Sequence, residues 1–130
     1  FKRINDTHGH QMGDLVLGRV AQVLQATARK GDLICRLGGE EFLVVALDIE
    51  PAGAFQLAER LREVISHSEV PSLSAQGPIR CTVTIGVSQG FSHPQALDAV
   101  LQQAGAALYR GKESGRDRVE SAFAPLPLPA

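Results

Sequence analysis

The 130-residue sequence has little net charge and no long apolar run. Thirteen Lys and Arg residues face 14 Asp and Glu residues, for a formal net charge of -1. Such a balance gives no broad attraction to a nucleic-acid backbone or an anionic membrane. No apolar stretch approaches the roughly 18 residues that a membrane span requires. We therefore expect neither a nucleic-acid partner nor membrane contact from this segment.

Cysteine is also scarce, with two residues, Cys35 and Cys81, in apolar runs and no C-x-x-C pair. This pattern favours two buried thiols in a reducing cytosol over a disulfide or a metal site. No signal peptide is present, and the chain begins with Phe1 rather than Met. We expect a cytoplasmic location and a natural N-terminus further upstream.

What the chain does contain is an ordinary globular composition, 44% hydrophobic, which suits one domain with a real core. Apolar periodicity and turn residues predict a series of elements. In chain order these are a loop at 1–14, a helix at 14–30, a hairpin at 32–47, a helix at 51–67, a loop at 70–79, a strand at 79–90, a helix at 94–115, a short strand at 117–122 and a frayed tail at 124–130. The mixture of antiparallel and crossover connections predicts an α/β or α+β sandwich with one sheet.

The stretch "CRLGGEEFLVV", residues 35–45, places two glutamates directly after a glycine pair. Gly38 and Gly39 form a two-residue hairpin turn without a steric penalty. Carboxylates beside glycines can hold a magnesium ion whose other ligands are phosphates, because the backbone there leaves room for a bulky group. The alternative is an exposed hairpin tip on which Glu40 and Glu41 aid solubility. The stretch alone does not decide between the two.

Other polar residues near turns have structural interpretations. Asp14 can cap a helix that begins at Leu15, and Asn5 can form a turn. Lys112 and Arg116 can interact favourably with the dipole at a helix C-terminus.

Five segments together resemble the GGDEF family of diguanylate cyclases, over residues 1 to about 119. They are "FKRIND", "GHQMGD", "RLGGEEF", "TVTIGVS" and "ALYRGKESGRDRV", in the family's order and spacing. The resemblance implies a central mixed sheet surrounded by helices, similar to the palm of polymerases and to adenylate cyclase. It also implies condensation of two GTP molecules into cyclic di-GMP by a homodimer, with release of two pyrophosphates.

By the same resemblance the acidic turn is the catalytic centre. Glu41 binds Mg²⁺ (or Mn²⁺), Glu40 lies close to the metal and the attacking hydroxyl, and Gly38 and Gly39 let the α-phosphate approach. The substrate-binding residues that the resemblance implies are Asn5 and Asp14 for guanine, and Phe1, Lys2, Lys112 and Arg116 for the phosphates.

An R-x-x-D motif, Arg29 to Asp32, lies just before the hairpin. Its position relative to "GGEEF" resembles the family's allosteric site for product inhibition, to which Arg60, or its neighbour Arg62, adds a contact. Arginine can bind guanine O6 and N7, and aspartate can take the N1/N2 edge. The alternative is a cation at a helix end followed by a turn aspartate.

The sequence departs from the family in two places. Family members have a strand and a metal-binding aspartate before the position of Phe1, so we expect residues 1–121 to be a GGDEF domain without its N-terminal strand, followed by a disordered tail at 122–130. This exact chain is then expected to be inactive or weak. Gly111 stands where an alanine is usual, at a cost of about 1 kcal/mol of helix stability at most.

Two further functions compete with the cyclase. A catalytically silent module could sense cyclic di-GMP through Arg29 and Asp32, or GTP through its former active site. A purely structural dimerisation domain would leave the cations and carboxylates unexplained, so it ranks last.

Overall fold

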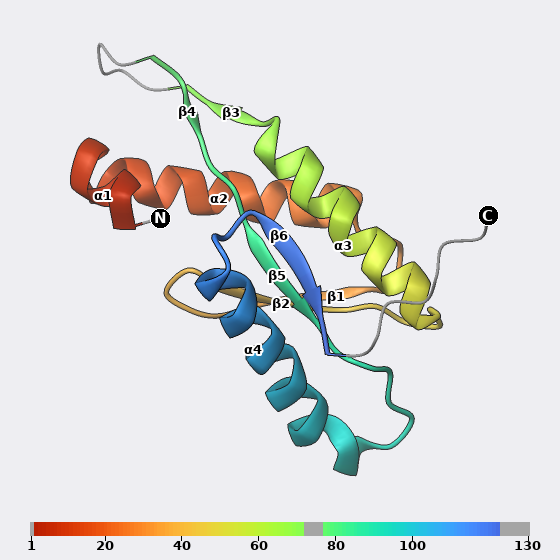
Figure 1. Ribbon diagram of the computed structural model, residues 1–130. Coiled ribbons are helices and arrows are strands. Elements are labelled where there is room, and N and C mark those ends of the chain that lie inside the picture. The colour runs from red at the N-terminus through yellow and green to blue at the C-terminus, as the bar shows by residue number, and fades with distance from the viewer. Residues whose placement is uncertain (1, 72–76, 123–130) are drawn as a thin grey trace, which may run out of the picture. The chain divides into compact units, whose positions relative to one another are not determined.

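The computed structural model describes residues 2–71 and 77–122 (Figure 1). The chain divides into two compact units. The first unit is Phe1–Leu47 with Glu63–Cys81, and the second is Asp48–Arg62 with Thr82–Ala130. The elements, in chain order, are α1 (Lys2–His8), α2 (His10–Thr27), β1 (Leu33–Gly38), β2 (Glu41–Val45), α3 (Pro51–Ser66), β3 (Glu69–Val70), β4 (Ile79–Arg80), β5 (Thr84–Val87), η1 (Pro94–Ala96), α4 (Leu97–Glu113) and β6 (Arg118–Ser121). Phe1, the middle of the loop predicted at 70–79 and the predicted tail from residue 123 onward lie outside the described residues.

The first unit begins with a helix pair where the sequence predicted a loop. The loop expected over residues 1–14 is wrong, because α1 and the first turns of α2 occupy it. Gly9, at φ 88°, allows the chain to turn between the two helices. Ile4 and Met12 pack against a buried cluster around Val16, so tertiary burial outweighs the weak helix propensity of this polar segment.

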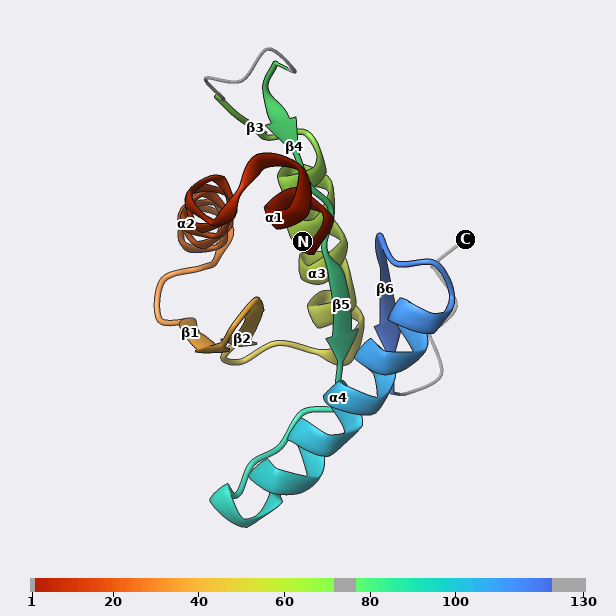
Figure 2. The same cartoon turned by 90° about the vertical axis from the view of Figure 1, so that its left-hand side faces the viewer.

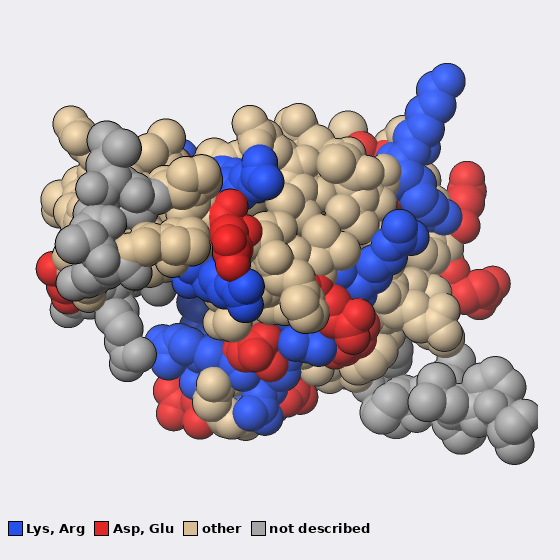
Figure 3. Space-filling model, turned by 90° about the horizontal axis from the view of Figure 1, so that it is seen from above, with Lys and Arg blue, Asp and Glu red and all other residues tan. Residues whose placement is uncertain are grey.

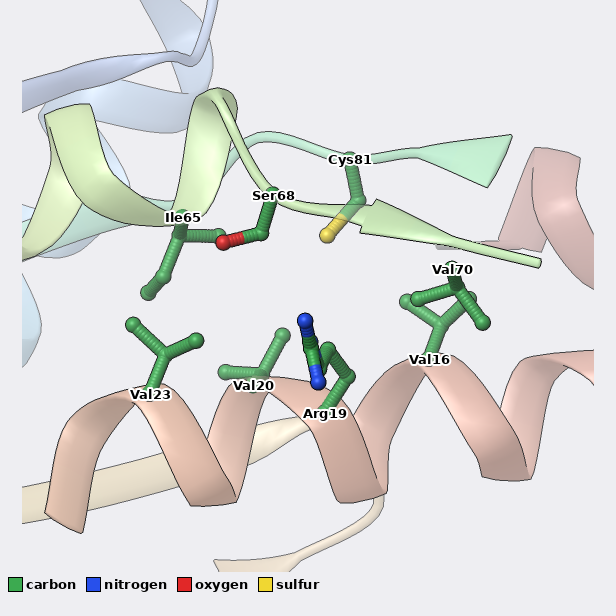
Figure 4. A pocket seen from close by; sticks show the side chains of 8 residues that line it. All are labelled: Val16, Arg19, Val20, Val23, Ile65, Ser68, Val70 and Cys81. Atoms are coloured by element: carbon green, nitrogen blue, oxygen red, sulfur yellow. The ribbon is translucent and has the colours of Figure 1, made fainter. Parts of the chain in front are cut away.

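The core of the first unit lies between α2 and the last turn of α3 together with the segment that follows it. Val16 is 1% exposed and Ile65 is 2% exposed, and both point into a hollow whose lining is largely apolar (Figure 4). Cys81 also lines this hollow, and burial raises the pKa of its thiol. Cys35 is exposed on β1, so the prediction of two buried thiols is wrong for it; five of the six residues of β1 are exposed.

In the second unit β5 and β6 run parallel and α4 connects them, as a crossover helix must. The helix packs against both strands (Figure 2). Gly86 of β5 makes this packing possible, because a Cβ there would lie 2.1 Å from the carbonyl oxygen of Ala104. Glycine is thus required where strand and helix backbones meet.

The described strands form three two-stranded sheets, of which β1–β2 and β3–β4 are antiparallel, so the prediction of one central mixed sheet is wrong for the described strands. The strand predicted at 79–90 is divided into β4 and β5. Helices and strands are mixed along the chain, so the predicted α+β class is confirmed. No helix of the described residues is both long and apolar enough to cross a membrane.

Candidate active site

The acidic turn joins β1 to β2 in the first unit, as the glycine pair predicted. The strands pair in register from Leu33 opposite Val45, and a bulge lies between Arg36 and Gly38. The two turn residues are Gly39 and Glu40, one position later than predicted, because Gly38 still pairs with Glu41. Gly38 and Gly39 have φ values of 137° and 53°, which residues with a side chain rarely adopt.

Arg36 fixes this turn, a role that sequence reasoning missed. Its Nε donates to the carbonyl oxygen of Gly39 at 2.9 Å, and its Nη2 donates to the same oxygen. A guanidinium fork on one carbonyl removes freedom from the turn backbone. The only sequence signal for this role was an arginine two residues before a glycine pair. The bulge determines that the Gly39 carbonyl becomes its partner.

The carboxylates of Glu40 and Glu41 are both exposed, one on the turn and the other at the first residue of β2. Two adjacent carboxylates suit Mg²⁺, which takes one or two protein carboxylates and completes its shell with water and phosphate oxygens. The described residues hold no group of three or more His, Cys, Asp and Glu side chains that could bind a metal. The two exposed carboxylates are donors of the kind that Mg²⁺ takes from a protein.

The predicted guanine-binding residues lie on the α1–α2 helix pair of the same unit. Asp14 is the fifth residue of α2 and is exposed, while Gly9 occupies the N-cap position. The alternative that Asp14 caps a helix at Leu15 is therefore wrong. Asn5 is partly buried in α1, and its Oδ1 has no hydrogen-bond partner among the described residues. A buried amide oxygen without a partner is costly, so this position calls for a hydrogen-bond donor that the described residues do not supply.

The predicted phosphate-binding cations belong to the second unit. Lys112 is in the last turn of α4, and Arg116 follows the helix with φ 63°. Phe1 lies outside the described residues, and of Lys2 only the backbone is described, as the first residue of α1. On the face seen in Figure 3, acidic and basic side chains are intermingled.

Arg29 and Asp32 are brought together by the turn between α2 and β1. Asp32 Oδ2 accepts from the Arg29 amide at 3.0 Å and from Arg29 Nε at 3.4 Å. Asp32 Oδ1 accepts from the Leu47 amide at 3.2 Å and from Arg29 Nη2 at 3.4 Å, and Nη2 also donates to the Leu47 carbonyl. The side chain of Asp32 is 1% exposed, and that of Arg29 is 46% exposed.

These contacts determine the charge state of Asp32. Burial alone would raise its pKa, but the Leu47 amide and then the Arg29 guanidinium and amide outweigh burial and hold the pKa below its ordinary value. Four donors meet the approximately four lone pairs of the carboxylate. The structure thus gives Asp32 a local role in fixing the turn, while much of Arg29 remains available to a ligand.

Of the two arginines predicted as alternatives on α3, Arg60 is the exposed one. Arg62 is bound to Glu59 and to Asp117, each at 3.0 Å. Its pKa is raised above the ordinary value by the hydrogen bond to Glu59 first and by that to Asp117 second. A surface ligand would therefore meet Arg60 more readily than Arg62.

These observations define an α+β domain with a glycine-bent hairpin that presents two exposed carboxylates. The family model described as "Diguanylate cyclase, GGDEF domain" matches residues 1–118. The chain belongs to the diguanylate cyclase GGDEF domain family. Diguanylate cyclases of this family are metal-dependent.

Two curated relatives are identical to this chain at more than a third of the aligned positions. Diguanylate cyclase A of Treponema denticola is 38% identical over 120 residues, which cover 92% of this chain and 32% of the relative. Response regulator PleD of Caulobacter vibrioides is 40% identical over 119 residues, which cover 92% of this chain and 26% of that protein. The chain thus spans about a third or less of the length of these relatives.

Solved structures agree with the fold. The GGDEF domain of DgcB from Caulobacter crescentus, in complex with c-di-GMP, matches with a TM-score of 0.84 and 32% identity, over 95% of this chain and 70% of that one. The active GGEEF domain of a diguanylate cyclase from Vibrio cholerae matches with a TM-score of 0.81 and 31% identity, over 95% and 76%.

Proposed function

We propose that this chain is a diguanylate cyclase domain that condenses two GTP molecules into cyclic di-GMP. The observation that carries the proposal is the intact acidic hairpin, whose two carboxylates are exposed beside a turn that Arg36 fixes. The similarity to named diguanylate cyclases and to a GGDEF domain in complex with c-di-GMP supports the same reaction.

The reaction forms two phosphodiester bonds between two GTP molecules, one held by each domain of a homodimer. The 3′-hydroxyl oxygen of each ribose bonds to the α-phosphorus of the other GTP, and the bond from that phosphorus to pyrophosphate breaks. In this proposal Glu40 accepts the hydroxyl proton. Glu41, with Glu40, would hold Mg²⁺ or Mn²⁺, which offsets charge on the phosphate oxygens and lowers the pKa of the hydroxyl.

The remaining residues select and hold the nucleotide. Asp14 and Asn5 recognise the guanine edge, and adenine is disfavoured because it cannot supply the donors that the Asp14 carboxylate needs. Lys112 and Arg116, with Phe1 and Lys2, bind the phosphates of the triphosphate. Product inhibition is assigned to a second cyclic di-GMP site at Arg29, Asp32 and Arg60.

The test is to incubate the natural full-length protein with GTP and Mg²⁺ and to identify the nucleotide product by mass spectrometry. Cyclic di-GMP and pyrophosphate in a ratio of one to two are expected. Glu41→Ala should lower turnover by about 10²–10⁴-fold, since a metal contributes several kcal/mol to the transition state. Glu63→Ala, which removes an exposed carboxylate from α3, is the matched control and should keep wild-type turnover.

Two results would contradict the proposal. Glu41→Ala with near-normal turnover would remove the acidic hairpin from the chemistry. Binding of GTP or cyclic di-GMP by the wild type without any product would instead establish the sensing module as the function.

A further inference from the structure

The segment that leaves α4 carries backbone strain. Gly115, Arg116 and Asp117 are consecutive residues with positive φ values of 117°, 63° and 49°. The left-handed conformation costs a residue with a side chain about 1–2 kcal/mol, although aspartate is found there more often than most. Strain of this kind persists where the surrounding structure fixes the backbone, and it gathers at functional sites.

Backbone bonds fix the near side of this strained turn. The Arg116 amide donates to the Gly111 carbonyl at 3.0 Å, and the Gly115 amide donates to the Lys112 carbonyl at 3.4 Å. This pair of bonds is a Schellman motif, which ends α4 at a defined residue. The carbonyl of Arg116 accepts from Arg118 Nε at 3.2 Å. Both backbone polar groups of Arg116 therefore have partners.

Side chains from two other elements fix the far side. The Asp117 amide donates to Thr84 Oγ1 of β5 at 3.2 Å, and Asp117 Oδ1 accepts from Arg62 Nη1 of α3 at 3.0 Å. Arg62 is itself held by Glu59 at 3.0 Å, and its side chain is 20% exposed. Arg62 and Thr84 thus contact Asp117 from elements distant in sequence, and neither contact was predicted.

We propose that Arg62, Thr84 and Asp117 are positioning residues that hold Arg116 in the conformation in which it meets the triphosphate of the nucleotide. This inference rests on the proposed function, in which Arg116 binds those phosphates. With the peptide groups on both sides of Arg116 fixed, the backbone conformation of Arg116 and the direction of its Cα–Cβ bond are set before the ligand arrives. Fixing the backbone of a free residue costs about 1–2 kcal/mol, and a backbone that is already fixed removes part of that cost from binding.

The test compares a nucleotide that has the outer phosphates with one that lacks them. Affinities of the natural protein for GMP and for a GTP analogue with an uncleavable α–β bridge are measured by calorimetry. Asp117→Ala should weaken the analogue about 3–10-fold, by loss of pre-organisation, and leave GMP unchanged. Asp117→Asn should keep most of the affinity, because asparagine tolerates the left-handed conformation and still accepts from Arg62.

Thr84 supplies a second pair of variants in case Asp117→Ala does not fold. Thr84→Val keeps the shape but leaves the Asp117 amide without its acceptor, so the GTP analogue should again bind more weakly. Thr84→Ser restores the acceptor and should restore the affinity. Glu63→Ala is the control for loss of a carboxylate beside Arg62.

Double variants show whether the effect passes through Arg116. Adding Asp117→Ala to Arg116→Ala should weaken the GTP analogue no further than Arg116→Ala alone. Equal losses for GMP and the analogue, additive losses in the double variant, or unchanged affinity in Asp117→Ala and Thr84→Val would each overturn the positioning role. Wild-type protein that does not bind the GTP analogue at all would overturn the proposed function, and this inference with it.

Discussion

The close approach of β5 to α4 predicts opposite effects for the same substitution at two glycines. In Gly86→Ala the new Cβ would lie 2.1 Å from the carbonyl oxygen of Ala104 and 2.6 Å from the amide nitrogen of Leu108. Gly105 lies on α4, and in Gly105→Ala the new Cβ would meet nothing within 4 Å. Gly86→Ala should therefore loosen the packing of α4, and Gly105→Ala should stabilise the helix.

The magnitude follows from which atoms collide. Both atoms that the Gly86→Ala methyl would meet are backbone, so no rotamer change can relieve the contact, and strand and helix must separate by about 1 Å to reach van der Waals distance. Overpacking costs about 1–3 kcal/mol, and a collision with backbone belongs at the upper end. Gly105→Ala should gain about 1 kcal/mol, the difference in helix propensity between the two residues.

Hydrogen exchange of the α4 amides in the natural protein measures both effects locally. A loss of about 3 kcal/mol corresponds to exchange roughly a hundredfold faster in Gly86→Ala, and the gain in Gly105→Ala to exchange about fivefold slower. Wild-type exchange of α4 in Gly86→Ala would refute the close contact. Faster exchange in Gly105→Ala would show that the outer face of α4 is covered in the natural protein.

Two predictions concern ligand binding. Arg29→Ala should raise the inhibition constant of cyclic di-GMP about 10–100-fold, the value of a lost charge-assisted contact, whereas Lys30→Ala, which removes the neighbouring exposed cation, should leave it unchanged; overlapping inhibition curves for all three proteins would remove the product site from Arg29. Asp14→Asn should weaken GTP binding about 10–100-fold, because an amide oxygen cannot replace both carboxylate acceptors, with little change in melting temperature at this exposed position; normal affinity would place guanine elsewhere.

Local sequence patterns predicted the hairpin and the two later helices. Two short apolar runs around Gly38 and Gly39 are a short-range signal, and pairing from Leu33 to Val45 satisfies it. The shift of the turn by one residue comes from the bulge after Arg36, which depends on cross-strand contacts. Apolar periodicity placed α3 and α4 close to their observed ends.

The N-terminal helices were not predictable from local preference. Gly9 and Gly13 in a polar segment indicate a loop, yet Gly13 is buried within α2. The helical state there depends on packing of Ile4 and Met12 against Val16, a contact with the folded core rather than a property of the segment.

The site shows the same division. The motif spacing indicated Glu41, Asp14 and Arg116 as functional residues. The roles of these three residues remain predictions. The groups that hold such residues in place were missed. Arg62 and Thr84 reach Asp117 from positions 55 and 33 residues away, and no local pattern reports a contact over that separation.

Both carboxylate oxygens of Asp32 already accept hydrogen bonds, and this affects any ligand at the R-x-x-D motif. A nucleobase that binds this carboxylate through its hydrogen-bonding edge must break the hydrogen bond that Leu47 or Arg29 already donates to it. Swapping one hydrogen bond for another yields little net free energy. Discrimination between ligands at this motif would then come chiefly from the half-exposed guanidinium of Arg29. Because this guanidinium also donates to the Leu47 carbonyl, a ligand that bound it instead would free the chain just beyond β2.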